Sequence, residues 1–150
     1  MSMAVKRLNR ELNEIQKNPI EGFILSDTSD IMIWKGIIEG PKDTPFENGK
    51  FPIQLTFDTD YPLRPPSVKY LVPIFHPNIY RDGKICVDIL QINEWSPALT
   101  ITTIALSLRS LLIDPNPSSP ANRDAAKLFM ENKIEYENKV REDIKNSNKF

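Results

Sequence analysis

The side chains best suited to covalent chemistry lie close together, between residues 76 and 88. His76, Asn78, Cys86 and Asp88 fall in this stretch, and they include the only cysteine and the only histidine of the chain. A cysteine thiol is intrinsically very nucleophilic and can attack an already activated acyl group without a dedicated base. A lone cysteine between two apolar residues is equally typical of a small buried hydrophobe. The residue types alone leave both interpretations open.

Cysteine, histidine and asparagine together suggest a hydrolytic triad, in which histidine deprotonates the thiol and asparagine orients the ring. The chain order argues against it. In papain-like proteases the cysteine comes far before its partners, whereas here it comes last, ten residues after His76. His76 is followed by Pro77, with a turn at Asp82 soon after, which favours a loop-holding imidazole. The Asn78 amide could instead donate to an oxyanion. One such hydrogen bond typically accelerates the reaction about 10²–10³-fold.

Composition excludes several other classes of function. One cysteine cannot close an intramolecular disulfide, and one cysteine with one histidine cannot form an ordinary zinc site. A formal net charge of −1 gives no electrostatic footprint for nucleic acid or anionic lipid. Charges every few residues near the N-terminus argue against a signal peptide, and no apolar run approaches the roughly 20 residues of a membrane span. We expect a single domain over residues 1–150, monomeric and cytoplasmic or nuclear, with no nucleic-acid or membrane partner.

The thirteen prolines show where helices can form. Residues 1–18, 98–114 and 121–150 contain none, and proline disrupts helix interiors. In the first window Val5, Leu8, Leu12 and Ile15 repeat at helical spacing and predict a buried stripe. The polar cover of that helix is predicted to be Lys6, Arg7, Arg10, Glu11, Glu14 and Lys17. The second window predicts a central helix, and the third predicts a short helix followed by an amphipathic one.

Strands are predicted between residues 23 and 70. Phe51, Ile53, Leu55 and Phe57 alternate with less apolar residues at a period of two. The preceding segment 31–40 and an Asn48-Gly49 turn predict a hairpin. Shorter strands are expected at 23–25 and 68–70. The predicted fold is therefore α+β: an N-terminal helix, a four-stranded antiparallel meander, a long irregular loop, a central helix and two C-terminal helices.

Three motifs follow one another in the chain: His76-Pro77-Asn78, Cys86-Val87-Asp88-Ile89-Leu90 and Trp95-Ser96-Pro97-Ala98-Leu99. In this order they resemble the core of a ubiquitin-conjugating enzyme. Similar segments flank them, namely Ile38-Glu39-Gly40-Pro41 with Thr44-Pro45-Phe46, the proline-rich Tyr61-Pro62-Leu63-Arg64-Pro65-Pro66, and Asp114-Pro115-Asn116-Pro117. The resemblance covers residues 3–146 without a large gap.

The resemblance implies a transferase of the ubiquitin conjugation pathway. Cys86 would accept ubiquitin as a thioester from an activating enzyme. With a RING-type or cysteine-type ligase, it would pass ubiquitin to lysines of substrate proteins. ATP is used upstream, so the resemblance implies no bound cofactor and no metal. Asn78 is implied to steady an oxyanion or the loop around it, and His76 and Pro77 to hold that loop. Leu106 and Ser110 match positions that pack against the thioester-linked ubiquitin.

Deprotonation of the acceptor lysine is the harder step, because a lysine of pKa about 10.4 is less than roughly 0.1% neutral at pH 7. Many relatives have an aspartate at the position of Ser119, so the group that assists the lysine stays open, with Asp88 as the nearest alternative. Ser119 precedes Pro120. We expect phosphorylation there to supply the missing anion and to raise the transfer rate.

A surface for the ligase and the activating enzyme is also implied, at Lys6, Arg7, Leu63, Ser96, Pro97 and Ala98. Taken without the family, Lys6 and Arg7 are equally typical of a solvated helix face, and an exposed leucine is common. The loop 91–94 is one residue longer than in the relatives it resembles, so contacts beside Cys86 are expected to be displaced.

Other features bear on the branch of the family and on competing functions. Phe75, Gln91 and the segment 118–122 resemble the branch associated with DNA repair and N-degron turnover, whereas the segment 95–99 resembles the general-purpose branch. One alternative is an inactive variant that binds another conjugating enzyme, although such variants lack the nucleophile. The other is a cysteine hydrolase.

Overall fold

The computed structural model describes residues 2–147. Its elements are α1 (Met3–Lys17), β1 (Phe23–Asp30), β2 (Ile33–Glu39), β3 (Lys50–Thr56), β4 (Ser67–Tyr70), the 3-10 turn η1 (Asp88–Leu90), α2 (Ile101–Ile113), α3 (Arg123–Glu131) and α4 (Lys133–Ser147). The predicted α+β order of helix, sheet, irregular stretch and helices is confirmed. β1 is longer than expected.

The helices begin at polar side chains that cap free backbone N–H groups. The Ser2 hydroxyl accepts from Val5 N at 3.2 Å, and the Thr100 hydroxyl accepts from Thr103 N at 3.2 Å. The predicted polar cover of α1 was wrong at Glu11, which is buried with the apolar stripe, and at Arg7, whose side chain is mostly buried. Val5, predicted for the buried stripe, is only partly buried. Arg7 one turn earlier and two distant residues, Tyr61 and Ile101, donate hydrogen bonds to the Glu11 carboxylate, which allows this burial.

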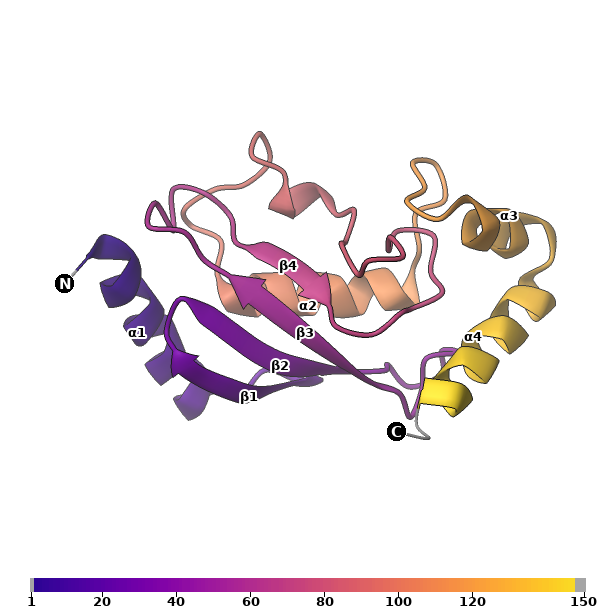
Figure 1. The fold of residues 1–150 in the computed structure, drawn as a ribbon, viewed down its shortest axis with the longest axis horizontal. Coiled ribbons are helices and arrows are strands. Elements are labelled where there is room, and N and C mark those ends of the chain that lie inside the picture. Colours follow the sequence, from indigo (N-terminus) through magenta and orange to yellow (C-terminus); the bar gives the residue numbers. More distant parts are fainter. Residues whose placement is uncertain (1, 148–150) are drawn as a thin grey trace.

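The four strands form an antiparallel meander in the order β1-β2-β3-β4 (Figure 1). Ile38 of β2 pairs with Phe51 of β3, and Ile53 of β3 pairs with Tyr70 of β4. The predicted period of two is confirmed, since alternate residues of β3 are buried. The β2–β3 connection spans residues 40–49, longer than a two-residue turn, and Asn48 adopts a left-handed φ of 70° in it.

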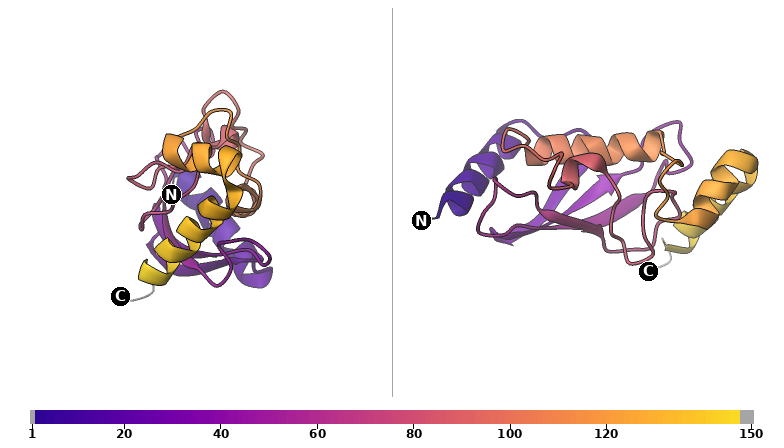
Figure 2. Two further views of the ribbon diagram at one scale, coloured as in Figure 1. Left: turned by 90° about the vertical axis from the view of Figure 1, so that its right-hand side faces the viewer. Right: turned by 90° about the horizontal axis from the view of Figure 1, so that it is seen from above.

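Figure 2 shows how the helices surround the sheet. α2 runs along one face of the sheet, while α1 lies at one end of the molecule and α3 with α4 at the other. The core between α2 and the sheet includes Trp34, Ile53, Ile104 and Leu108. None of the helices in the described part of the chain is long and apolar enough to cross a membrane. The irregular stretch 71–100, which includes η1, connects the end of β4 to the start of α2.

Candidate active site

A tight hairpin brings Asn78 and Cys86 together. Cys86 N donates to the backbone oxygen of Asn78 at 2.8 Å, and Tyr80 N donates to Lys84 O at 2.9 Å. Gly83 closes the turn with a φ of 92°, a conformation that favours glycine. The eight-residue spacing of Asn78 and Cys86 in the sequence is thus the length of this hairpin.

The hairpin is fixed to the edge of the sheet. Tyr70 N, at the end of β4, donates to Gly83 O at 2.8 Å, and Lys69 pairs with Lys84 as an isolated bridge. A side chain at Gly83 would collide with the backbone oxygen of Tyr70. The position of the Cys86 backbone is therefore determined by the sheet as well as by the hairpin.

His76 is fully buried and uses both ring nitrogens for hydrogen bonds. Nδ1 accepts from Asn78 N at 2.9 Å, and Nε2 lies 2.8 Å from Leu111 O. A backbone N–H can only donate and a carbonyl can only accept, so the neutral ring with its hydrogen on Nε2 satisfies both partners. Burial lowers the pKa of His76 to about 4, against the opposing effect of the hydrogen bond to Leu111. This geometry leaves neither nitrogen free to deprotonate Cys86, as a hydrolytic triad would require.

The Asn78 side chain clamps the hairpin to the segment after α2. Its Nδ2 donates to Asn116 O at 2.7 Å, and its Oδ1 accepts from Asn116 N at 2.8 Å. The neighbouring Pro77 oxygen accepts from Ala121 N at 2.8 Å and from Asn122 N at 3.0 Å. The loop that includes Ser119 is therefore held against the loop that includes His76 and Asn78, as Figure 1 shows.

The residues predicted to act at the reaction centre are accessible to different degrees. Cys86 is half-buried, between Asn78 and η1. Asp88, the first residue of η1, and Ser119 are both exposed. Asn78 is buried. Cys86 is thus partly exposed, whereas the Asn78 amide is already bonded to backbone.

The predicted ligase surface consists of three segments near one another. Trp95 Nε1 donates to Pro62 O at 2.8 Å, which ties the loop after η1 to the proline-rich loop. Lys6, Ser96, Pro97 and Ala98 are exposed, and Leu63 is 61% exposed. Arg7 differs, because its side chain is only 13% exposed. Its guanidinium bonds to Glu11 and to Leu99 O.

The two residues predicted to pack against ubiquitin lie on one outer face of α2. Leu106 and Ser110 are both exposed, and their spacing of four residues places them one turn apart. Ile113 extends the same face and is also exposed. This face is therefore free for contact with another protein.

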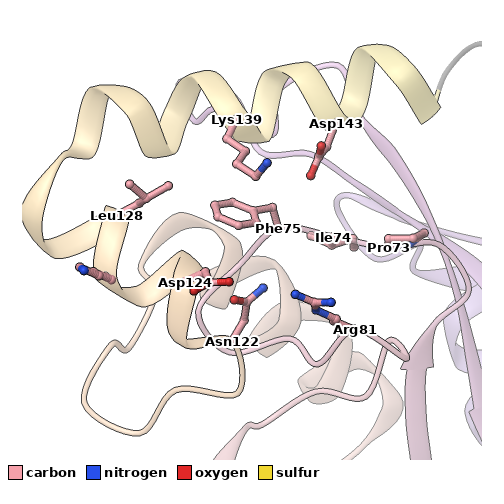
Figure 3. A pocket seen from close by; sticks show the side chains of 10 residues that line it. Pro73, Ile74, Phe75, Arg81, Asn122, Asp124, Leu128, Lys139 and Asp143 are labelled. Carbon is pink, nitrogen blue, oxygen red and sulfur yellow. The ribbon is translucent and has the colours of Figure 1, made fainter.

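A cleft near the site does not include the thiol. It has a volume of about 680 Å³ and lies between α3, α4 and the segment 73–75 (Figure 3). Lys139 lies over the Phe75 ring there, with its Nζ 5.4 Å from the ring centroid. Among the described residues, no three His, Cys, Asp or Glu side chains gather as metal ligands would. The described site is a partly exposed thiol on a hairpin that is bonded to the sheet edge.

Comparison with known proteins agrees with this geometry. The model of the ubiquitin-conjugating enzyme family matches residues 7–144. The chain belongs to the ubiquitin-conjugating enzymes. Its relatives include Ubiquitin-conjugating enzyme E2 1 of Caenorhabditis elegans, 47% identical over 95% of this chain and 74% of the relative. Ubiquitin-conjugating enzyme E2 2 of Mycosarcoma maydis is 48% identical over 95% and 77%. Ubiquitin-conjugating enzyme E2 3 of Arabidopsis thaliana is 48% identical over 96% of both chains.

As a ubiquitin-conjugating enzyme, the protein is a transferase that passes ubiquitin on through a thioester. The resemblance drawn from its motifs is confirmed at the level of the family. Sequence reasoning missed two residues that organise the site, Leu111 and Asn116. It also missed the contacts of Glu11 and Tyr61, which join α1 to distant segments away from the site. Leu111 and Asn116 act through backbone atoms and leave no signal in side-chain type. Tyr61 lay within a recognised motif without an assigned role.

Proposed function

We propose that Cys86 is the residue that accepts ubiquitin, and that this chain transfers it to substrate lysines together with a ligase. The number of cysteines in the chain supports this proposal most directly. An enzyme that works through a thioester needs a thiol, and Cys86 is the single cysteine of the chain. Its half-buried position, on a hairpin fixed to the sheet, suits a group that must be reached by two other proteins in turn.

Two acyl transfers follow from this assignment. The Cys86 sulfur attacks the carbonyl carbon of the thioester on the activating enzyme, a new C–S bond forms, and the activating enzyme's thiol leaves. The acceptor lysine nitrogen then attacks the same carbon, a C–N bond forms, and the Cys86 thiolate leaves while the amine loses a proton. The nucleotide chemistry belongs to the activating enzyme, which supports the proposal that this chain binds no cofactor.

Asn78 is proposed to act first through the loop. Both ends of its side-chain amide are bonded to the backbone of Asn116. An amide has two N–H donors, and one of them is bonded to Asn116, so we propose that the other donates to an oxyanion formed at Cys86. His76 and Pro77 are proposed to hold the same loop, because His76 and the Pro77 oxygen both bond to the segment 111–122.

For the lysine proton we propose Asp88 or the Ser119 position. Both are exposed, and the Ser119 loop is bonded to the loop of Asn78. Phosphorylation of Ser119 would place a dianion beside the incoming ammonium and stabilise the alignment of the acceptor. The exposed α2 face of Leu106 and Ser110 is proposed to contact the bound ubiquitin.

We propose that Lys6, Leu63, Ser96, Pro97 and Ala98 contact the ligase and the activating enzyme. All are exposed and lie on segments joined by the hydrogen bond between Trp95 and Pro62. Ligases of the RING type and of the cysteine type are both proposed partners. We further propose a monomer that works in the cytoplasm or nucleus, with a free thiol suited to a reducing compartment.

One experiment tests the central proposal. The chain is incubated with activating enzyme, ATP and ubiquitin, and the products are separated with and without reductant. We expect an adduct that reductant removes, no adduct with Cys86→Ala, and a reductant-resistant oxyester with Cys86→Ser. Ubiquitin-like modifiers serve as specificity controls. An adduct that persists in Cys86→Ala would contradict the proposal, and so would the absence of any adduct with the unaltered chain.

A further inference from the structure

A buried carboxylate lies where three segments of the chain meet. Glu11, on α1, is only 7% exposed. Its Oε1 accepts from Ile101 N, at the start of α2, at 2.8 Å. Its Oε2 accepts from Arg7 Nε at 3.0 Å and from the Tyr61 hydroxyl of the proline-rich loop. A buried carboxylate is costly unless it is paired and hydrogen-bonded, so these partners stabilise one arrangement of the three segments.

Arg7 extends the same network to a fourth segment. Its Nη2 donates to Leu99 O at 3.0 Å, and its Cζ lies 5.8 Å from the centroid of the Tyr61 ring. Tyr61 in turn lies against Trp95, with ring centroids 6.2 Å apart. Burial and the hydrogen bond to Glu11 raise the pKa of Tyr61, so its hydroxyl remains a donor. The loop 95–99 is therefore tied to α1 from one side and to the proline-rich loop from the other.

The segments joined in this way are those that present the proposed ligase surface. Lys6 lies on α1, Leu63 on the proline-rich loop, and Ser96 to Ala98 on the loop tied by Arg7 and Trp95. Glu11 and Tyr61 are buried and cannot touch a ligase. Their effect on a ligase must act through the positions of the exposed residues.

The network is remote from the reaction centre along α2. Glu11 binds the first residue of that helix, whereas His76 binds Leu111 O, ten residues further on. Ten residues of α-helix span about 15 Å. We therefore expect a change at Glu11 to alter the ligase surface while leaving the loop around Cys86 in place.

We infer that Glu11 and Arg7 are positioning residues for the ligase, which hold α1, the proline-rich loop and the loop 95–99 in one binding surface. This inference rests on the proposed function. It also revises the role of Arg7, which acts through its bonds to Leu99 and Glu11 instead of by direct contact with the ligase. A weakened network raises the ligase concentration that gives half-maximal stimulation, because ordering the three segments on binding then costs free energy.

The test compares Glu11→Gln with Glu14→Gln, the same substitution at an exposed site of the same helix. Discharge of ubiquitin from Cys86 to free lysine is measured without a ligase, and then with increasing amounts of a RING domain that stimulates the unaltered chain. We expect ligase-free discharge within twofold for both variants. The half-saturating RING concentration should rise about tenfold in Glu11→Gln, with the maximal rate retained, and should not change in Glu14→Gln.

Tyr61→Phe is the second variant, because it removes only the hydroxyl that bonds to Glu11. It should raise the half-saturating concentration severalfold, and it decides the matter if Glu11→Gln does not unfold cooperatively. An unchanged half-saturating concentration would overturn the inference. So would an equal fall of ligase-free and ligase-stimulated rates, since that result indicates general destabilisation. Failure of the proposed function is distinct, because the unaltered chain would then form no thioester at all.

Discussion

The buried imidazole of His76 should make the stability of this protein depend on pH in a predictable direction. Its pKa is about 4 in the folded chain, because burial disfavours the charged ring, against an ordinary value of 6.5. Between these values the unfolded chain binds a proton that the folded chain does not. The free energy of unfolding must therefore fall as pH drops from about 7.5 towards 4, and His76 contributes no further loss below that.

The size of the effect follows from the two pKa values. At about 1.4 kcal/mol per pKa unit, the difference corresponds to about 3 kcal/mol in total, of which about 2 kcal/mol is already lost at pH 5.0. A typical domain is stable by only about 5–15 kcal/mol, so the loss is measurable. His76→Gln is the comparison variant, since its amide nitrogen can still donate to Leu111 O but does not titrate.

Urea unfolding at pH 7.5, 6.5, 5.5 and 5.0 measures both proteins. Carboxylates also titrate at the acid end of this range, but both proteins contain the same ones, so their contribution cancels in the difference. We expect the unaltered chain to lose about 2 kcal/mol more than His76→Gln between pH 7.5 and 5.0. Because the chain has one histidine, its imidazole NMR signals also report the folded-state pKa directly. Equal losses in the two proteins, or an imidazole that titrates near 6.5 in the folded state, would refute the reasoning.

Three further predictions concern the site. Asn78→Ala removes two buried hydrogen bonds and should lower the free energy of unfolding by about 2 kcal/mol. It should also slow discharge to lysine by about 10²-fold. An unchanged free energy of unfolding in urea would show that the hydrogen bonds between Asn78 and Asn116 do not stabilise the fold. Ser119→Asp should accelerate single-turnover discharge roughly tenfold, which is less than the roughly 10²–10⁴-fold acceleration by a well-aligned base. The neighbouring Ser118→Asp is the control and should give no acceleration. If Ser119→Asp gives none either, the phosphorylation hypothesis is refuted. Leu106→Glu should slow ligase-stimulated discharge about tenfold with stability changed by less than about 0.5 kcal/mol. Met130→Glu, at another exposed apolar site, is its control, and equal rates in the two variants would contradict a ubiquitin contact at Leu106.

Much of the fold could be predicted from local sequence patterns. Helices formed in the proline-free windows because proline lacks the N–H that a helix interior requires. The alternation through β3 gave the buried face of the sheet, because successive side chains of a strand point to opposite sides. The motifs around Cys86 and Asn78 gave the family, since their order and spacing are specific to it.

The polar contacts between distant segments could not be predicted in this way. Glu11 was assigned to the solvated face of α1 because it is charged, yet it is buried at a junction with residues 50 and 90 positions away. Arg7, assigned to the same solvated face, is mostly buried beside it. The partner of His76 is a backbone oxygen 35 residues distant, and backbone atoms leave no trace in residue type.

The sequence by itself determined the secondary structure, the family and the one residue able to form a thioester. Periodicity, proline placement and motif spacing are local properties, and residue type alone settles which side chain is a thiol. Only the tertiary structure decided that His76 is a neutral, buried support and that Asn78 is bonded on both sides of its amide. It also decided that Glu11 joins the segments of the proposed ligase surface. The physical reason is that a polar group is buried only where the fold supplies its hydrogen-bond partners, and those partners lie far away along the chain.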